Sequence, residues 1–404
     1  MNGTMTVNII ITICALLIFA YIFDITSSKT KMPSVILLLI LGWLVRQGVN
    51  LFEFSIPDLS PLLPALGTIC LILIVLEGSL ELELNQSKYT IIGKTSIIAL
   101  LPMLFMSFCL AYVFQYVEGT TFKIGLINAV PYTIISSAIA IPTAKYLIAS
   151  NKEYITYESS LSDIFGVIFF NFITLNDNIC TQSVGHFLLQ LLIILIISIG
   201  CVLLLAFLLS KIKHHVKFVP IILLIILIYA ILKTYHLPAL IFILFFGLFI
   251  GNLDELKRFK YIDKLHPEIL NNEVNKFKEL TAEMTFLIRS LFFLFFGYSI
   301  ETSELLNTDT LIWSIAITVG IFVLRATFLK LFKLPANPLL FIAPRGLITI
   351  LLFMSIPLNH SLKIANKSLI IQVIISTGFI MMYGLIKTKK VEPKIVENES
   401  NRSI

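Results

Sequence analysis

The sequence predicts an all-α integral membrane protein with about thirteen transmembrane helices, arranged as two inverted repeats that each contain one broken crossing helix. Three observations lead to this prediction. Of the 404 residues, 57% are hydrophobic and only 13% are charged, against roughly 25% charged in a soluble chain. Apolar runs long enough to cross a bilayer recur along the whole chain, and Lys and Arg are concentrated in every second connecting loop.

The apolar runs define the predicted crossings. A bilayer core of about 30 Å needs about 20 mostly apolar residues per helix. Such runs lie near residues 6–24, 33–51, 62–80, 91–115, 124–148, 154–175, 185–210, 217–233, 237–252, 281–300, 309–329, 337–357 and 366–386. We therefore expect a transmembrane domain over residues 1–386 and a polar, disordered tail at 387–404. Because no Lys or Arg precedes the first run, we expect that run to remain as a helix rather than to be removed as a signal peptide.

The positive charges predict the orientation of the chain. With the N-terminus outside, the outer loops hold only Lys123, Lys233, Lys363 and Lys367, while most other Lys and Arg residues lie in inner loops. This asymmetry is the positive-inside pattern. An odd number of crossings then places the C-terminus in the cytoplasm, and the charged loop 253–280 becomes a cytoplasmic connector between two bundles.

Two predicted helices contain breaks. Pro131 and Pro142 interrupt the fifth, and Pro344-Arg345-Gly346 interrupts the twelfth. The two lie seven crossings apart, an odd offset that inverts one half relative to the other, with the first repeat at crossings one to six, the second at eight to thirteen and the seventh as linker. Paired broken helices in inverted halves are typical of a transporter with a binding site near the membrane midplane. Prolines alone would be a weaker indication, since they are common in membrane helices.

Asp163 is the deepest acid of the chain, well inside the sixth predicted helix. A charged side chain at the bilayer centre costs at least ~2.5 kcal/mol, so it needs a partner or a function. No basic residue lies beside Asp163 in the sequence. Ser159, one turn earlier, shares its helix face, so a hydroxyl and a carboxylate can converge on one cation. We therefore expect Asp163 to exchange a proton for a metal cation.

Other charges also fall inside predicted helices. Glu158 lies about 140° round the helix from Asp163 and must face something else. Arg345, between Pro344 and Gly346, is its predicted partner, and the pair is expected either to contact the ion or simply to join two helices. Glu77 is expected to line the ion path or to be solvated at the interface.

Three further charges are treated first as structural. Glu283 and Arg289 lie six residues apart and can pair with neighbours or with the third helix. Arg325 can extend to the cytoplasmic surface.

Several function classes are disfavoured. The five cysteines are far apart and show no CxxC spacing, and the six histidines fall in loops or at helix ends, so neither a disulfide framework nor metal catalysis is expected. No basic stripe with interleaved aromatic residues predicts nucleic acid binding. A membrane enzyme acting on lipid-linked substrates would need a catalytic pair near an interface, and none is evident. A cation channel without proton coupling, or a sensor, remains open, and no cofactor is expected.

Three motifs resemble the sodium/proton exchanger family of monovalent cation:proton antiporters. They are Glu158-Ser159 through Asp163, Leu76-Glu77-Gly78 through Leu84, and Arg345-Gly346, and the resemblance spans nearly the whole chain. It implies that Asp163 carries ion and proton, that Ser159 is a cation ligand and that Glu77 lies near the binding cavity. It also implies a stabilising Glu158–Arg345 pair and a homodimer in the cell membrane whose transport bundles move against a scaffold.

Two positions depart from the family pattern. Ser162 stands where the family has Asn, and Ile141 in Ala140-Ile141-Pro142-Thr143 stands where it has Asp. Backbone carbonyls at the break are then expected to supply the missing oxygen, together with hydroxyls from Thr133, Ser136, Ser137 or Thr143. With one acid at the core of the site, we expect electroneutral exchange of protons for a monovalent cation, with sodium ahead of potassium and lithium.

Overall fold

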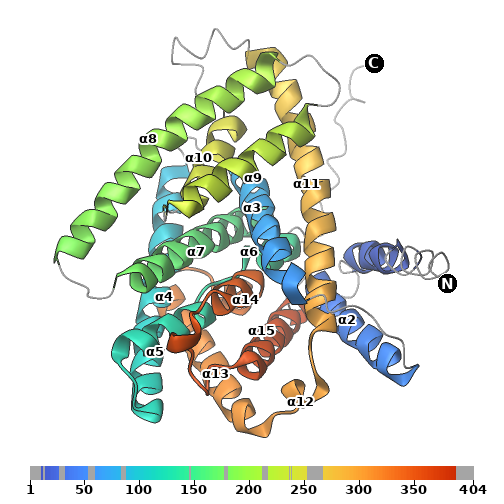
Figure 1. Ribbon diagram of the computed structural model, residues 1–404, viewed down its shortest axis with the longest axis vertical. Coiled ribbons are helices and arrows are strands. Elements are labelled where there is room, and N and C mark those ends of the chain that lie inside the picture. Colours follow the sequence, from blue (N-terminus) through green and yellow to red (C-terminus); the bar gives the residue numbers. More distant parts are fainter. Residues whose placement is uncertain are drawn as a thin grey trace, which may run out of the picture.

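The computed structural model describes residues 11, 14–26, 32–52, 60–82, 88–144, 147–176, 181–211, 217–235, 237, 239–252 and 267–387. Over these residues the chain forms helices joined by short turns (Figure 1). The predicted tail lies outside the described residues beyond Lys387. The part of the predicted cytoplasmic connector at 253–266 also lies outside them.

Over the described residues, every predicted crossing corresponds to a helix or to a pair of half-helices; the first predicted crossing is described from Cys14 on, and residues 6–10, 12 and 13 lie outside the described residues. The uninterrupted helices are Cys14–Thr26, α2 (Ser34–Leu51), α3 (Leu63–Glu81), α4 (Tyr89–Glu118), α7 (Ala149–Leu175), α8 (Thr181–Lys211), α9 (Phe218–Thr234), α10 (Leu240–Gly251), α11 (Pro267–Tyr298), α13 (Thr308–Leu331) and α15 (Lys367–Lys387). Short helices η1 (Ser60–Leu62), α12 (Thr302–Leu305) and η7 (Leu358–His360) lie in connections. In the described part of the chain, nine segments are long and apolar enough to span a bilayer. The prediction of an all-helical, multi-span membrane fold is confirmed.

The two remaining crossings are broken, as the prolines predict. The fifth consists of α5 (Phe122–Ala129), η3 (Val130–Tyr132) and α6 (Ser137–Ala144), and the twelfth consists of η6 (Leu339–Phe341) and α14 (Leu347–Met354). Pro131 and Pro344 lack the N–H that a continuing helix would need. Pro142 differs from the prediction, because it lies inside α6, which continues past it to Ala144. Its missing N–H removes one helical hydrogen bond without ending the helix.

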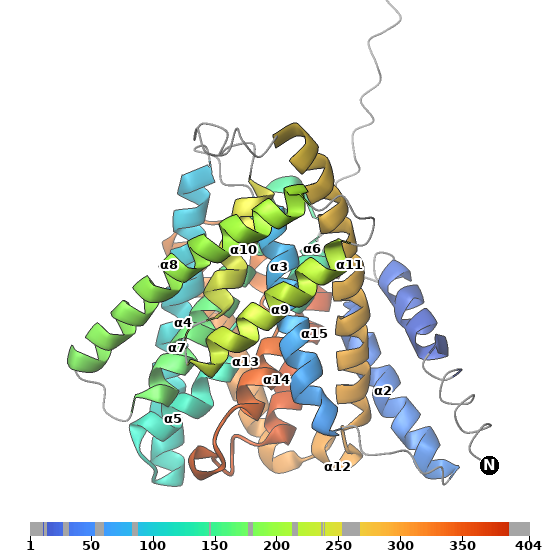
Figure 2. The same ribbon diagram turned by 45° about the horizontal axis from the view of Figure 1, so that its top comes forward.

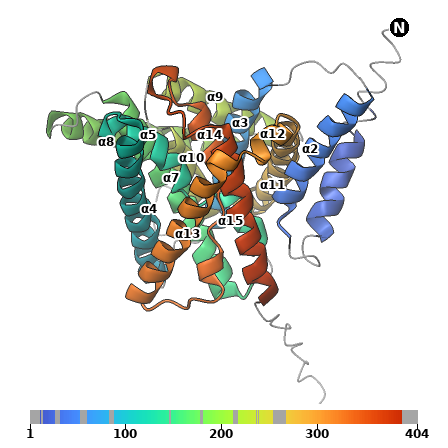
Figure 3. The ribbon, with the colours of Figure 1, turned by 90° about the horizontal axis from the view of Figure 1, so that it is seen from below.

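The packing of helices supports the inverted repeat. Helix α2 packs on α11 and α3 packs on α10, while α4 packs on α7 and α13 packs on α15. When crossings one to six are matched with crossings eight to thirteen, the α2–α11 pair corresponds to the α10–α3 pair. The α4–α7 pair corresponds in the same way to the α13–α15 pair. Gly42 and Gly297 allow α2 and α11 to touch, since a Cβ on either glycine would lie within 2.4 Å of a backbone oxygen of the other helix. Figure 3 shows α2 and the helix Cys14–Thr26 together at one edge of the molecule.

Helix α8, the linker between the repeats, crosses the outside of the bundle obliquely (Figure 2). Its apolar side chains are largely exposed, among them Leu188, Leu192, Ile196, Ile199 and Leu203. Such a surface is stable when lipid replaces water around it. The apolar face of α8 therefore forms part of the outer surface of the bundle.

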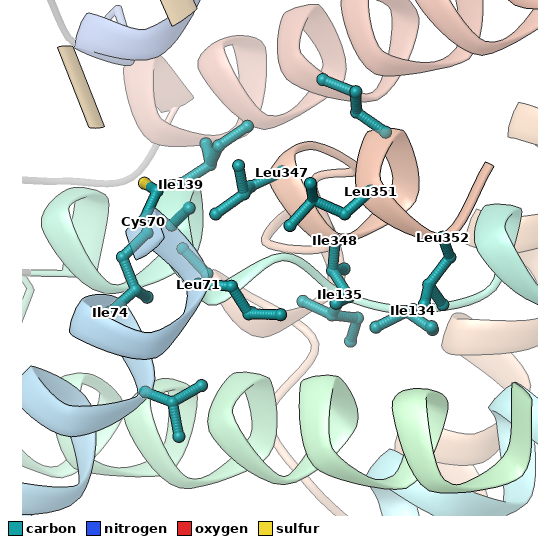
Figure 4. Close-up of a cluster of buried hydrophobic side chains, with 14 of the residues drawn as sticks. Cys70, Leu71, Ile74, Ile134, Ile135, Ile139, Leu347, Ile348, Leu351 and Leu352 are labelled. Carbon is teal, nitrogen blue, oxygen red and sulfur yellow. The ribbon is translucent and has the colours of Figure 1, made fainter. Parts of the chain in front are cut away.

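Apolar side chains enclose the two breaks. Figure 4 shows Leu71 and Ile74 of α3, Ile135 from the segment between η3 and α6, and Ile348 and Leu352 of α14 gathered in one cluster. All five side chains are buried. Charged side chains at the breaks, and backbone groups that have no hydrogen bond within a helix, consequently lie in a region of low dielectric constant, where their interactions are strong.

Candidate ion-binding site

The break before α6 brings Ser137 to Asp163. Residues 134–136 are not helical, and Ser137 begins α6. Its backbone N–H donates to Asp163 Oδ2 at 3.3 Å, and its hydroxyl donates to the same oxygen. Asp163 lies near the middle of α7 and is 2% exposed. The start of a half-helix therefore supplies two donors to a buried carboxylate, an arrangement that stabilises negative charge.

The second oxygen of Asp163 has no such support. Asp163 Oδ1 is buried and accepts no hydrogen bond within the described structure. A buried carboxylate oxygen without a donor is costly. A proton or a cation on Oδ1 would remove that cost, so this atom is suited to bind either.

The other predicted hydroxyls surround the break but are engaged with backbone groups. Ser159 donates to Ile155 O at 2.7 Å, Thr143 to Ile139 O at 2.7 Å and Thr133 to Val130 O at 2.8 Å. Ser162 Oγ instead accepts from Ile135 N at 3.0 Å. A hydroxyl that donates to a carbonyl keeps lone pairs for a cation, so the predicted role of Ser159 as a ligand stays a prediction.

A small cavity adjoins Ser137 on the side of α3. It is lined by Ile74, Glu77 and Gly78 of α3, by Ser137, Ala138, Ile141 and Pro142 of α6, and by Arg289 of α11. The structure thus brings Glu77 to the same space as Ser137, the partner of Asp163. Ile141 lines this cavity as well, so an acid at that position would share the cavity with Glu77.

Glu158 pairs with Arg325, and the predicted pair with Arg345 is wrong. Arg325 Nη1 lies 2.6 Å from Glu158 Oε1 and Arg325 Nη2 lies 2.9 Å from Oε2. The two side chains are 1% and 6% exposed, so Arg325 does not extend to the cytoplasmic surface either. The reason is that α13 packs on α4 beside α7, which places Arg325 within reach of Glu158. The two residues are 167 positions apart in the chain, and no sequence pattern predicts a contact between them.

Arg345 holds the two breaks together instead. Its guanidinium donates to Tyr132 O at 2.7 Å, to Ala343 O at 2.8 Å and to Thr133 O at 3.2 Å. Backbone groups also join the breaks, because Ser136 N donates to Pro344 O at 2.9 Å. These carbonyls lie at or just after the C-terminal ends of η3 and η6, where the partial charge is negative. Arg345 therefore neutralises the free carbonyls that the breaks create.

A second cavity of about 30 Å³ lies on the opposite side of the break, lined partly by Thr133, Ser162, Arg325 and Arg345. A volume of about 10–15 Å³ on this measure accommodates one water. The arginine side of the site can therefore be hydrated.

Of the remaining predicted charges, Arg289 lies close to the site and Glu283 does not. Glu283 is exposed on α11, whereas Arg289 is buried and lines the cavity with Glu77. Arg289 Nη2 lies 4.0 Å from Asp24 Oδ1 on the helix Cys14–Thr26. Arg289 therefore lies between two of its neighbours, with an ion pair to the first helix and a cavity shared with the third.

Comparisons with known proteins agree with this geometry. The family model described as sodium/hydrogen exchanger, transmembrane, matches residues 14–386. No curated protein sequence matches the chain. Two structures of MjNhaP1, a sodium proton antiporter from Methanocaldococcus jannaschii, are similar at 19% sequence identity. The one determined at pH 8 has a TM-score of 0.65 and aligns over 96% of this chain and 99% of that chain. The electron microscopy structure has a TM-score of 0.66 and aligns over 96% of each chain. At this identity the likeness establishes a common fold.

Proposed function

The chain belongs to the sodium/hydrogen exchanger family, and on that premise we propose that it exchanges protons for sodium at Asp163. Family membership makes the protein a membrane-embedded cation:proton antiporter rather than an enzyme. The proposal concerns the residues, the ion and the stoichiometry.

One observation carries the assignment of Asp163. Its carboxylate lies at the centre of a membrane helix, Ser137 supports one of its oxygens, and the other oxygen accepts no hydrogen bond from the described chain. Protonation or cation binding satisfies that oxygen equally well. Because one oxygen cannot hold both, the two substrates compete, and each crossing of the membrane carries one of them.

The remaining ligands are proposed from position. Ser159 lies one turn from Asp163 on the same helix face, and Glu77 lines the cavity that Ser137 shares. Thr143 and Ser162 flank the break. Together with carbonyls of the non-helical segment 134–136, these groups provide the oxygen ligands that a hard monovalent cation prefers.

One-for-one exchange follows from the charges around the site. Glu158 and Arg325 neutralise each other, and Arg345 is fixed on backbone carbonyls. In the proposed cycle neither the pair nor Arg345 binds the proton or the cation. A proton and a sodium ion each add one positive charge to the same carboxylate, so the loaded site has equal charge in both directions and transport is electroneutral.

We propose an outside N-terminus, a cytoplasmic C-terminus and a location in the cell membrane. The excess of Lys and Arg in the predicted inner loops supports this orientation. A homodimer, in which mobile transport bundles move against a static scaffold, is proposed from the family resemblance. The exposed apolar face of α8 offers a surface that lipid or a second copy could cover.

The proposed function is tested with purified protein in proteoliposomes that enclose a pH indicator. Sodium added outside is expected to drive protons out of the lumen, with saturation, and without dependence on an imposed membrane potential. Potassium and lithium are added in parallel to identify the cation. Cation flux that leaves the internal pH unchanged would indicate a channel and contradict the proposal. Exchange that the membrane potential alters would contradict electroneutrality.

A further inference from the structure

Arg289 is a buried guanidinium at the edge of the ion site. It lies in the membrane-spanning part of α11, at Asn272–Tyr298, and is 7% exposed. It lines the cavity that Glu77 and Ser137 also line. Ser137 in turn donates to Asp163. Arg289 is therefore separated from the carboxylate proposed to carry the ion by one layer of side chains.

Two acidic residues neighbour Arg289, and a third lies one residue further away, behind Ser137. Glu77 of α3 faces the same cavity, and Asp163 of α7 lies behind Ser137. On the other side, Asp24 of the helix Cys14–Thr26 lies 4.0 Å from Arg289 Nη2, at the outer limit of an ion pair. Asp24 is held there by Ser34, whose hydroxyl donates to Asp24 Oδ1 at 3.1 Å. The guanidinium thus has one acid in the ion cavity and a second acid outside it.

The other two arginines near the breaks are committed elsewhere. Arg325 makes a bidentate pair with Glu158, and Arg345 donates to three backbone carbonyls. Among the described residues that line the Glu77 cavity, Arg289 is the one arginine. In a small enclosed cavity, a neighbouring guanidinium opposes the entry of another cation and favours its departure.

We propose that Arg289 is a positioning residue that holds Glu77 while the cation is absent and turns toward Asp24 when a cation enters the cavity. The guanidinium then acts as a tethered competitor for Glu77. Its presence weakens cation binding, and weaker binding speeds release on the far side of the membrane. This inference rests on the proposed function, because it assumes that the transported cation visits the cavity between Glu77 and Asp163.

The test measures the KM for sodium and the maximal exchange rate in proteoliposomes, at alkaline pH where protons compete least. Arg289→Gln removes the charge, and it is expected to lower the KM about tenfold and to lower the maximal rate, because release slows. Arg289→Lys keeps the charge and is expected to stay near the wild type. In a Glu77→Gln background, Arg289→Gln is expected to leave the KM unchanged, since the competition has been removed.

Asp24→Asn gives an independent and opposite expectation. The substitution keeps the oxygen that accepts from Ser34 but removes the alternative partner of Arg289, so the KM for sodium should rise. This variant also decides the matter if Arg289→Gln does not fold. An unchanged KM in Asp24→Asn, or an equal fall in KM for Arg289→Gln with and without Glu77→Gln, would overturn the inference.

The outcome can be separated from failure of the proposed function. If Asp163→Asn abolishes exchange while the Arg289 and Asp24 variants keep the wild-type KM, only the role of Arg289 is wrong. If Asp163→Asn keeps full exchange, the premise itself is wrong.

Discussion

Asp163→Asn is expected to abolish proton-coupled cation exchange, with a fall of at least about a hundredfold in the initial rate. The amide is nearly the same size as the carboxylate and still accepts from Ser137 through its oxygen. It carries no charge, however, and it cannot take up or release a proton. The alternating loading that drives antiport would therefore stop. Sodium-evoked pH change in proteoliposomes measures the loss.

The matched control is Asp309→Asn. This substitution makes the same chemical change at an exposed aspartate in the first turn of α13. This variant should retain nearly full exchange. Undiminished exchange in Asp163→Asn, with correctly folded protein, would remove Asp163 from the mechanism.

Glu158→Gln is expected to destabilise the protein by about 3–5 kcal/mol, because it leaves the buried guanidinium of Arg325 without an anion. The bidentate contacts of 2.6 and 2.9 Å lie in a region where both side chains are almost fully enclosed. Thermal denaturation of the detergent-purified protein should show a clear loss of stability. Arg46→Gln serves as the control, since its 3.1 Å pair with Glu301 is partly exposed and such pairs contribute about 0–1 kcal/mol.

A double variant distinguishes the observed pair from the one expected from sequence. Glu158→Gln with Arg325→Gln removes both buried charges and should recover much of the lost stability. Glu158→Gln with Arg345→Gln should recover none, because Arg345 binds backbone carbonyls that would then lose their donors. Recovery by the Arg345 combination alone would contradict the pairing described here.

Hydropathy and charge were sufficient to predict the fold, because the membrane constrains the length of each apolar segment and the placement of charged residues. Each crossing must be about 20 apolar residues long, so the predicted run 91–115 and helix α4 at Tyr89–Glu118 nearly coincide. The break at Pro344 follows from the missing N–H of proline. The largest difference is at α11, which begins at Pro267 rather than near residue 281. Its first turns contain Glu268, Glu273 and Lys276, and a hydropathy window excludes such charged turns even when they are helical.

The site was only partly predictable. Asp163 was identifiable because an unpaired acid inside a long apolar helix is conspicuous. Ser137 was one of several hydroxyls near the break, and its direct contact with Asp163 depends on how α6 begins. The partner of Glu158 depends on the packing of α13 beside α7, a tertiary arrangement that neither periodicity nor spacing encodes. The sequence favoured Arg345 because it lies at a break, but the free carbonyls of both breaks engage its guanidinium.

The position of Ile141 explains why the missing acid does not leave the site without carboxylates. Ile141 and Glu77 line the same cavity beside Ser137. Glu77 therefore already supplies negative charge to the space that an acid at position 141 would face. Arg289 lines the same cavity and offsets part of this charge.

The central claim, that one carboxylate binds either a proton or a sodium ion, is tested most directly by proton release on sodium binding. Sodium is added to weakly buffered, detergent-purified protein over a range of starting pH values, and the released protons are counted. Because cation binding must displace the proton from Asp163, the wild type should release about one proton per protomer at its optimum, and Asp163→Asn should release none. Sodium binding without proton release in the wild type, or equal release in Asp163→Asn, would contradict the account.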